Sequence, residues 1–176
     1  MPLGANKVAL FGVAGVSTGD VVLLSSQTAS DSSSLDFTSG IDSTYGEYIF
    51  KFYNINPATD GVHFSFQVNA DGETGFNETM TTSFFKATHQ ENDASTGLTY
   101  KTGYDQAQGT AYQPIAETAG NGSDECCAGI LHLFNPSSTT YVKHFYSRVN
   151  EYHKDDSTID FFVAGYINTT AAIDEI

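Results

Sequence analysis

Residues Tyr45–Gly72, YGEYIFKFYNINPATDGVHFSFQVNADG, carry the clearest fold signal in the chain. In its second half four apolar residues alternate strictly with four polar ones: Val62, Phe64, Phe66 and Val68 against His63, Ser65, Gln67 and Asn69. Successive side chains of a strand point to opposite faces, so this alternation predicts a strand with one buried face and one wet face.

The first half of the stretch, Tyr48–Ile55, is aromatic and β-branched, and it carries apolar side chains on both faces. Such a composition favours a central strand, with a second layer or a partner chain over part of its outer face. Asn56–Gly61 lies between the halves, where Pro57 cannot donate to a strand ladder and Asp60-Gly61 favours a turn. We therefore expect the two strands to form a hairpin.

The rest of the chain repeats short apolar or alternating runs between turn residues. The expected strands are Val21–Ser26, Leu35–Phe37, Thr82–Glu91, Cys126–Phe134, Tyr141–Val149, Thr158–Asn168 and one beginning at Ala172. The segment 92–124 is irregular, and we expect a long loop there with one short strand near Tyr112. A count of about eight strands without a helical period predicts an all-β, antiparallel β-sandwich with a jelly-roll-like arrangement.

The first twenty residues differ in composition from the remainder of the chain. They are small and apolar, and Gly4, Gly12, Gly15 and Gly19 disfavour a helix. We expect residues 1–20 to be an extended N-terminal arm that docks on a neighbour, and residues 21–176 to be the sandwich domain.

Composition limits the partners. The 176 residues carry 21 acidic and 7 basic side chains, for a net charge of −14. Nucleic-acid backbones and anionic membranes attract Lys and Arg, so the sequence predicts neither as a partner. No apolar run approaches the ~18 residues of a membrane-spanning helix.

Motifs of catalysis are missing from the sequence: it has no nucleophile elbow, no phosphate-binding loop, no metalloprotease helix and no dinucleotide fingerprint. We therefore predict a protein without catalytic, cofactor-binding or metal-binding residues. His132 and His144 could face each other across a hairpin, but no carboxylate or cysteine stands at ligand spacing with them. Adjacent Cys126 and Cys127 are expected to be free thiols, since a bridge between neighbours needs strained geometry.

Two groups of apolar residues are the candidate interface. The first belongs to the arm: Val8, Leu10, Phe11 and Val13. The second consists of tyrosines, with Tyr53 on the outer face of its strand as a surface for self-association and Tyr100, Tyr104 and Tyr112 in the long loop. Loop tyrosines can stack on sugars, anchor a protein interface or cover the edge of a sandwich; we favour the protein interface.

Four segments carry a resemblance to a known family. They are FTSGIDSTYGEYIFKFYNINPATDGVHFSFQVNADG (37–72), DQAQGTAYQ (105–113), SSTTYVKHFYSRV (137–149) and FFVAGYINTTAAIDEI (161–176). From about Val21 onward the chain resembles small virion structural proteins of tailed bacteriophages, mainly marine ones.

This resemblance implies a non-enzymatic component of the virus particle. The first expectation is a capsid decoration (cement) protein on the particle surface, partnered by the major capsid protein or other virion proteins and by copies of itself as a trimer. The alternative is a tail or fibre component with a lectin-like, glycan-binding jelly-roll domain.

Overall fold

The computed structural model describes residues 21–176, and the predicted arm, with Val8, Leu10, Phe11 and Val13, lies outside the described residues. Asp31–Ile176 forms one compact unit, and 21–30 is the described part of another. The strand predicted at Val21–Ser26 is wrong, because these residues have no strand geometry and Val21–Leu24 are exposed. An apolar run becomes a strand only where its backbone groups pair with a neighbour.

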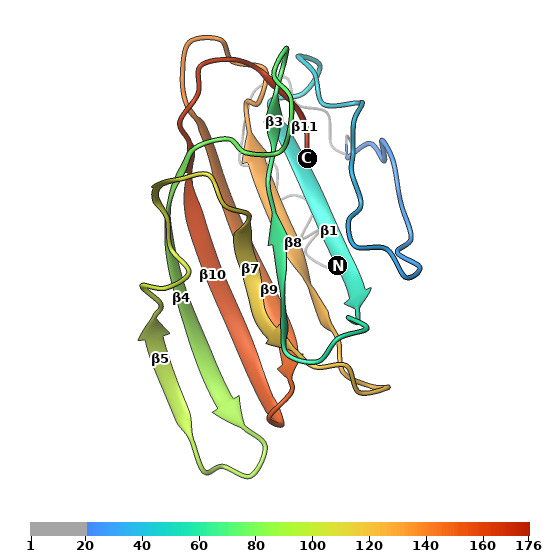
Figure 1. Cartoon of the computed structure of the whole chain (residues 1–176), viewed down its shortest axis with the longest axis vertical. Coiled ribbons are helices and arrows are strands. Elements are labelled where there is room, and N and C mark those ends of the chain that lie inside the picture. Colours follow the sequence, from blue (N-terminus) through green and yellow to red (C-terminus); the bar gives the residue numbers. More distant parts are fainter. Residues whose placement is uncertain (1–20) are drawn as a thin grey trace, which may run out of the picture. The chain divides into compact units, whose positions relative to one another are not determined.

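The described residues form strands and no helix, which confirms the predicted all-β class (Figure 1). The strands are β1 (Glu47–Ile55), β2 (Val62–Phe66), β3 (Asn69–Ala70), β4 (Met80–Gln90), β5 (Thr96–Tyr100), β6 (Ala107–Gly109), β7 (Gln113–Ala119), β8 (Cys127–Phe134), β9 (Lys143–His153), β10 (Ser157–Ile167) and β11 (Ile173–Glu175).

The large sheet is antiparallel, with the order β1-β8-β9-β10-β4-β5. Its centre is the meander β8-β9-β10, which confirms the predicted hairpin between the strands around 126–134 and 141–149. The turn at Lys154–Asp156, with Asp156 at a φ of 52°, joins β9 to β10. The hairpin register places His132 opposite Tyr146, so His132 and His144 are not a cross-strand pair.

Two short pairs of strands form the second layer of the sandwich: β2 with β7, and β3 with β11. β7 joins the large sheet through the single pair Ala119–His153. Phe37 exchanges two backbone hydrogen bonds with Ile176, of 2.7 and 3.1 Å, and so lies beside β11 although its segment has no strand geometry. The predicted β-sandwich is therefore the observed architecture.

The hairpin predicted within Tyr45–Gly72 is wrong. β1 pairs with β8 and β2 pairs with β7, so the turn at 56–61 carries the chain from one layer to the other. The apolar faces of the two strands face each other, and Phe52 meets Phe64 edge to face with ring centroids 4.9 Å apart. Stacking the strands face to face buries both apolar faces, whereas edge pairing would leave them side by side.

β1 is also an edge strand of the large sheet rather than a central one. Its ladder is interrupted between Phe52 and Ile55, where Asn54 takes a φ of 51°. A bulge of this kind ends regular pairing and is common at sheet edges, where it hinders pairing with further strands.

The core lies between the two layers, as the alternation of the sequence predicts. Phe66, Phe161 and Val163 are buried in one cluster, and Phe64 is partly buried against it. The other buried members come from both layers: Val68, Ala70, Met80, Phe84, Ile115, Ala116, Cys127, Leu131, Leu133, Phe145, Val149, Ile159, Ile167 and Ile173.

The segment 92–124 is more regular than predicted, because it contains β5, β6 and β7. The buried amide of Gln113 holds its centre together: Gln113 donates to the Tyr104 carbonyl at 2.9 Å and accepts from the Thr82 hydroxyl at 2.7 Å. Side-chain bonds of this kind leave no periodic mark in the sequence, so the glycine-rich composition pointed to a loop instead.

Candidate interaction surface

The outer face of the large sheet carries a row of large side chains that crosses every strand of the sheet order. Cross-strand pairing aligns, in sequence, Lys51, Ile130, Arg148, Phe162, Phe85 and Tyr100. Neighbours in such a row have Cβ atoms about 4.5–5.5 Å apart, so their side chains form a continuous ridge. We call these six residues the outer row.

The aromatic half of the outer row is packed and yet open to solvent. Phe85 and Phe162 stack with ring centroids 4.9 Å apart and planes 4° from parallel. Phe85 is 37% exposed, Tyr100 52% and nearby Leu98 74%. Exposed apolar side chains that gather on one sheet face make that face a candidate binding surface.

Arg148 fixes the polar side of this surface. Its guanidinium lies over the Phe162 ring, 5.1 Å from the centroid, and donates to Asp160 through Nη2 at 2.6 Å and Nε at 3.1 Å. The hydrogen bonds to Asp160 and its negative charge raise the pKa of Arg148. The side chain is therefore a fixed cation, held in plane for hydrogen bonding or stacking.

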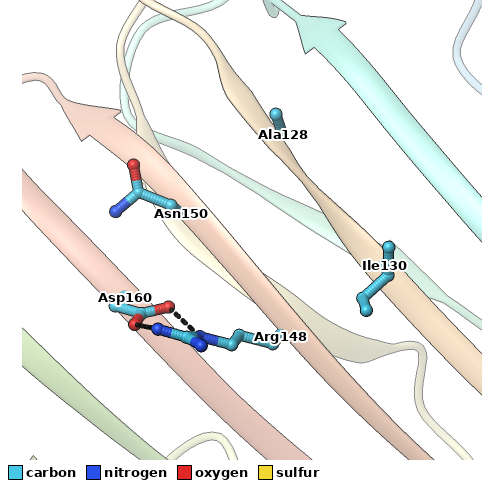
Figure 2. Close-up of a pocket in the computed structure, with 5 residues that line it drawn as sticks. All are labelled: Ala128, Ile130, Arg148, Asn150 and Asp160. Carbon is cyan, nitrogen blue, oxygen red and sulfur yellow. Dashed lines mark hydrogen bonds and ion pairs between the residues drawn. The ribbon is translucent and has the colours of Figure 1, made fainter. Parts of the chain in front are cut away.

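A shallow hollow lies beside Arg148, lined by Ala128, Ile130, Arg148, Asn150 and Asp160 (Figure 2). Figure 2 shows Arg148 directed toward Asp160 on β10 and away from the small Ala128 on β8. Asn150 donates to the Thr158 hydroxyl at 2.9 Å and to the Ile159 carbonyl at 3.0 Å, so its amide is held by β10. The hollow is an open depression with an ion pair on one side.

A second aromatic group extends the surface toward β1. His132 stacks on Tyr146 with centroids 4.5 Å apart, and Phe134 lies 5.7 Å from the same ring. His132 Nδ1 is 2.6 Å from a Glu47 carboxylate oxygen. Aromatic side chains thus lie on the outer face from β8 to β5.

The structure separates the tyrosines predicted as one interface. Tyr100 belongs to the outer row and donates to Asp105 at 2.7 Å, whereas Tyr53 lies exposed on β1 at the opposite edge of the sheet. Tyr112 is exposed just before β7. Tyr104 packs against the core, near Phe84 and His63 with centroids 5.5 and 5.0 Å away.

The surface residues predicted from the sequence do not include Phe85, Phe162 and Arg148. The signal was present in the alternation of β10, where Ile159, Phe161 and Val163 form the inward row and Phe162 must therefore point outward. Phe85 follows the buried Phe84 in the same way. Aromatic residues on the outward face of neighbouring alternating strands therefore indicate a candidate surface.

Neither a metal centre nor a spanning helix is found in the part of the chain that the structure describes. Among residues 21–176 no group of three or more His, Cys, Asp or Glu side chains could hold a metal ion. None of these residues belongs to a helix long and apolar enough to cross a membrane. Cys126 and Cys127 are free thiols, as predicted.

Comparisons of the chain with protein-family models, with curated proteins and with solved structures give no match.

Proposed function

We propose that this chain is a non-enzymatic structural protein of a tailed-bacteriophage virion: a capsid decoration protein on the particle surface. Its partners are the major capsid protein and further copies of the chain, assembled as a trimer. The assignment to a virus particle is supported by the resemblance to small virion proteins of four segments, 37–72, 105–113, 137–149 and 161–176. The β-sandwich is compatible with that role.

The exposed outer row is the observation that carries this proposal. An acidic chain with a net charge of −14 exposes Phe85, Leu98 and Tyr100 together on one sheet face. Aromatic and Arg side chains dominate the energetics of protein interfaces, and the outer row contains both. The acidic remainder of the surface keeps the unbound protein soluble.

The test compares binding to particles that lack this protein. Purified wild-type chain, fluorescently labelled, should sediment with such particles, and the double variant Phe85→Ser/Tyr100→Ser should bind at least tenfold more weakly. Tyr141→Ser is the matched control, since Tyr141 is exposed but lies outside the outer row. Electron microscopy of labelled particles then locates the protein; a label found nowhere on intact particles contradicts the proposal.

Glycan binding by a tail or fibre component is the second candidate, and the outer row also favours it. Flat, exposed rings beside the fixed Arg148–Asp160 pair are the combination that stacks on sugar rings and bonds their hydroxyls. A glycan-array signal lost in Tyr100→Ala, and not in Tyr53→Ala, supports this candidate. Tyr104→Ala is uninformative here, because that ring packs against the core.

A further inference from the structure

A charged cluster lies inside the sandwich, between the two layers. Lys86 belongs to the inward row of β4, and its ammonium contacts the carboxylate of Glu117 on β7. The Glu117 side chain is only 4% exposed and that of Lys86 15%. The second Glu117 oxygen lies 3.3 Å from Lys101 Nζ. The Lys86 amine of the large sheet and the Glu117 carboxyl of the second layer therefore meet largely away from solvent.

Glu151 is a second carboxyl in this interior. It lies on the inward row of β9, is 1% exposed, and pairs across strands with Cys127 and Ile159. Neither of its carboxyl oxygens has a hydrogen-bond partner in the described part of the chain. Burial first, and the nearby Glu117 charge second, raise the pKa of Glu151 to about 8, while Lys86 opposes the rise. At neutral pH Glu151 is mainly a protonated acid within electrostatic range of Glu117 and Lys86.

We propose that Lys86 and Glu117 become joined by an isopeptide bond after folding, with Glu151 as the group that transfers the protons. Three observations support this: the contact between amine and carboxyl, the low exposure of both side chains, and an unpartnered buried acid within electrostatic range of both. Holding an amine against a carboxyl in fixed geometry converts a bimolecular reaction into an intramolecular one. An ion pair alone would not require a third, unpaired acid, because burying such a group is costly.

The reaction is a condensation that needs no other reactant. A proton passes from the Lys86 ammonium to the Glu117 carboxylate, which leaves a neutral amine and a neutral acid. The Nζ lone pair attacks Cδ of Glu117, forming the C–N bond. Through a bridging water, since neither of its oxygens is within hydrogen-bond distance of the pair, Glu151 gives its proton to the departing hydroxyl and takes one from the nitrogen; one water leaves and Glu151 ends protonated as it began.

Lys101 is the competing amine and is a bystander in this reaction. Its side chain is twice as exposed as that of Lys86, at 30%, and its Nζ lies 5.1 Å from the centroid of the Tyr104 ring. Lys86 Nζ also lies closer to the Glu117 carboxylate than Lys101 Nζ does. The charge of Lys101 instead stabilises the oxygen that becomes negative on Glu117 during the attack.

Mass spectrometry of the denatured, full 176-residue chain is the direct test. The folded protein, incubated until its mass is constant, should be lighter than its sequence mass by one water. Tryptic digestion should fail after Lys86 and give a branched peptide that links the Lys86 region to the region containing Glu117. A chain with its full sequence mass and an ordinary cut after Lys86 overturns the proposal, and this measurement requires no variant to fold.

Variants assign the roles. Lys86→Arg and Glu151→Ala should keep the full mass, whereas Lys101→Arg, the matched control, should still lose one water. Glu117→Gln should form the same bond and lose one ammonia instead. Asp60-Gly61 and Asp71-Gly72 could lose water by cyclisation, so a mass loss that persists in Lys86→Arg refutes the inference. The inference does not depend on the proposed function, since particle binding is not its readout.

Discussion

Phe66 of β2 and Phe145 of β9 meet edge to face, with ring centroids 4.9 Å apart and planes at 81°. Phe66 belongs to the second layer, and Phe145 belongs to the centre of the large sheet. Both are nearly buried, at 7% and 2% exposure. This contact packs the second layer against the large sheet, as Phe52–Phe64 also does, and its loss would remove part of the core.

Phe66→Ala should lower the free energy of unfolding by about 3–5 kcal/mol, because truncation of a buried Phe removes its burial and leaves a cavity. Denaturant titration followed by circular dichroism measures the change. Phe85→Ala is the control: its ring lies on the outer face, and it should cost much less. Equal losses of unfolding free energy in the two variants would mean that Phe66 contributes no more to stability than a residue on the outer face.

Stability should depend on pH through Glu151. Its pKa is about 8 in the folded chain against an ordinary 4.5, so between these values the folded state holds a proton that the unfolded state has lost. The free energy of unfolding therefore falls as the pH rises through this window. Glu151→Gln should remove this slope, whereas Glu73→Gln, at an exposed position, should keep it.

The comparison with Glu151→Gln also isolates this effect from His153. Burial lowers the pKa of His153, so that residue makes the protein less stable as the pH falls below its ordinary 6.5. Both proteins share this opposite slope, and it cancels in their difference. A difference between wild type and Glu151→Gln that is flat from pH 5 to about pH 8 would contradict the buried acid.

The two cysteines should differ in reactivity. Burial, with the charge of Glu151 as a smaller cause, raises the pKa of Cys127 to about 12, and only the thiolate reacts with alkylating agents. Native protein treated with iodoacetamide at pH 8 should therefore be modified at Cys126 and spared at Cys127, and both should react in denaturant. Peptide mapping measures each site. Rapid native labelling of Cys127 would show that the end of β8 opens to solvent.

Sequence periodicity predicted the sandwich because side-chain alternation reports which face of a strand is buried. It identified the inward rows of β2 and β10, including Phe66 and Phe161. It identified the hairpin of β8 and β9 but not the partners of β1 and β2, since the turn at 56–61 is compatible with a hairpin and with a crossing between layers. The choice depends on the match between Phe52 and Phe64 across the core, which a local pattern does not contain.

The candidate surface was harder to predict for the same reason. The outer row unites residues from strands that are far apart in the chain, and only the register brings Arg148, Phe162 and Phe85 together. The buried cluster of Lys86, Glu117 and Glu151 likewise joins β4, β7 and β9. Tyrosines in a glycine-rich segment were visible in the sequence, but their direction was not: Tyr100 faces out, and Tyr104 packs inward.

Self-association should depend on concentration and on Tyr53. Its side chain is 70% exposed on the edge strand β1, where an aromatic ring favours contact with another chain. Light scattering should show a trimer that dissociates on dilution, and Tyr53→Ser should shift the dissociation to higher concentration. Tyr112→Ser, also exposed, is the control. A monomer at every concentration, with and without particles, would contradict this prediction.

Removal of the residues before the sandwich should weaken attachment to a partner while leaving the sandwich folded. Residues 31–176 form a compact unit of their own, so a chain that begins at Asp31 should fold with little change in melting temperature. We expect this truncation to weaken binding to the particle or to sister chains, because Val21–Leu24 are exposed apolar residues that a partner would bury. A second truncation that removes only residues 1–20 divides the effect between the two segments. Calorimetry measures the melting temperature, and particle sedimentation measures the binding. A truncated chain that fails to fold would mean that part of 1–30 belongs to the core. A truncated chain that folds and binds as tightly as the full chain would exclude a docking role for these residues.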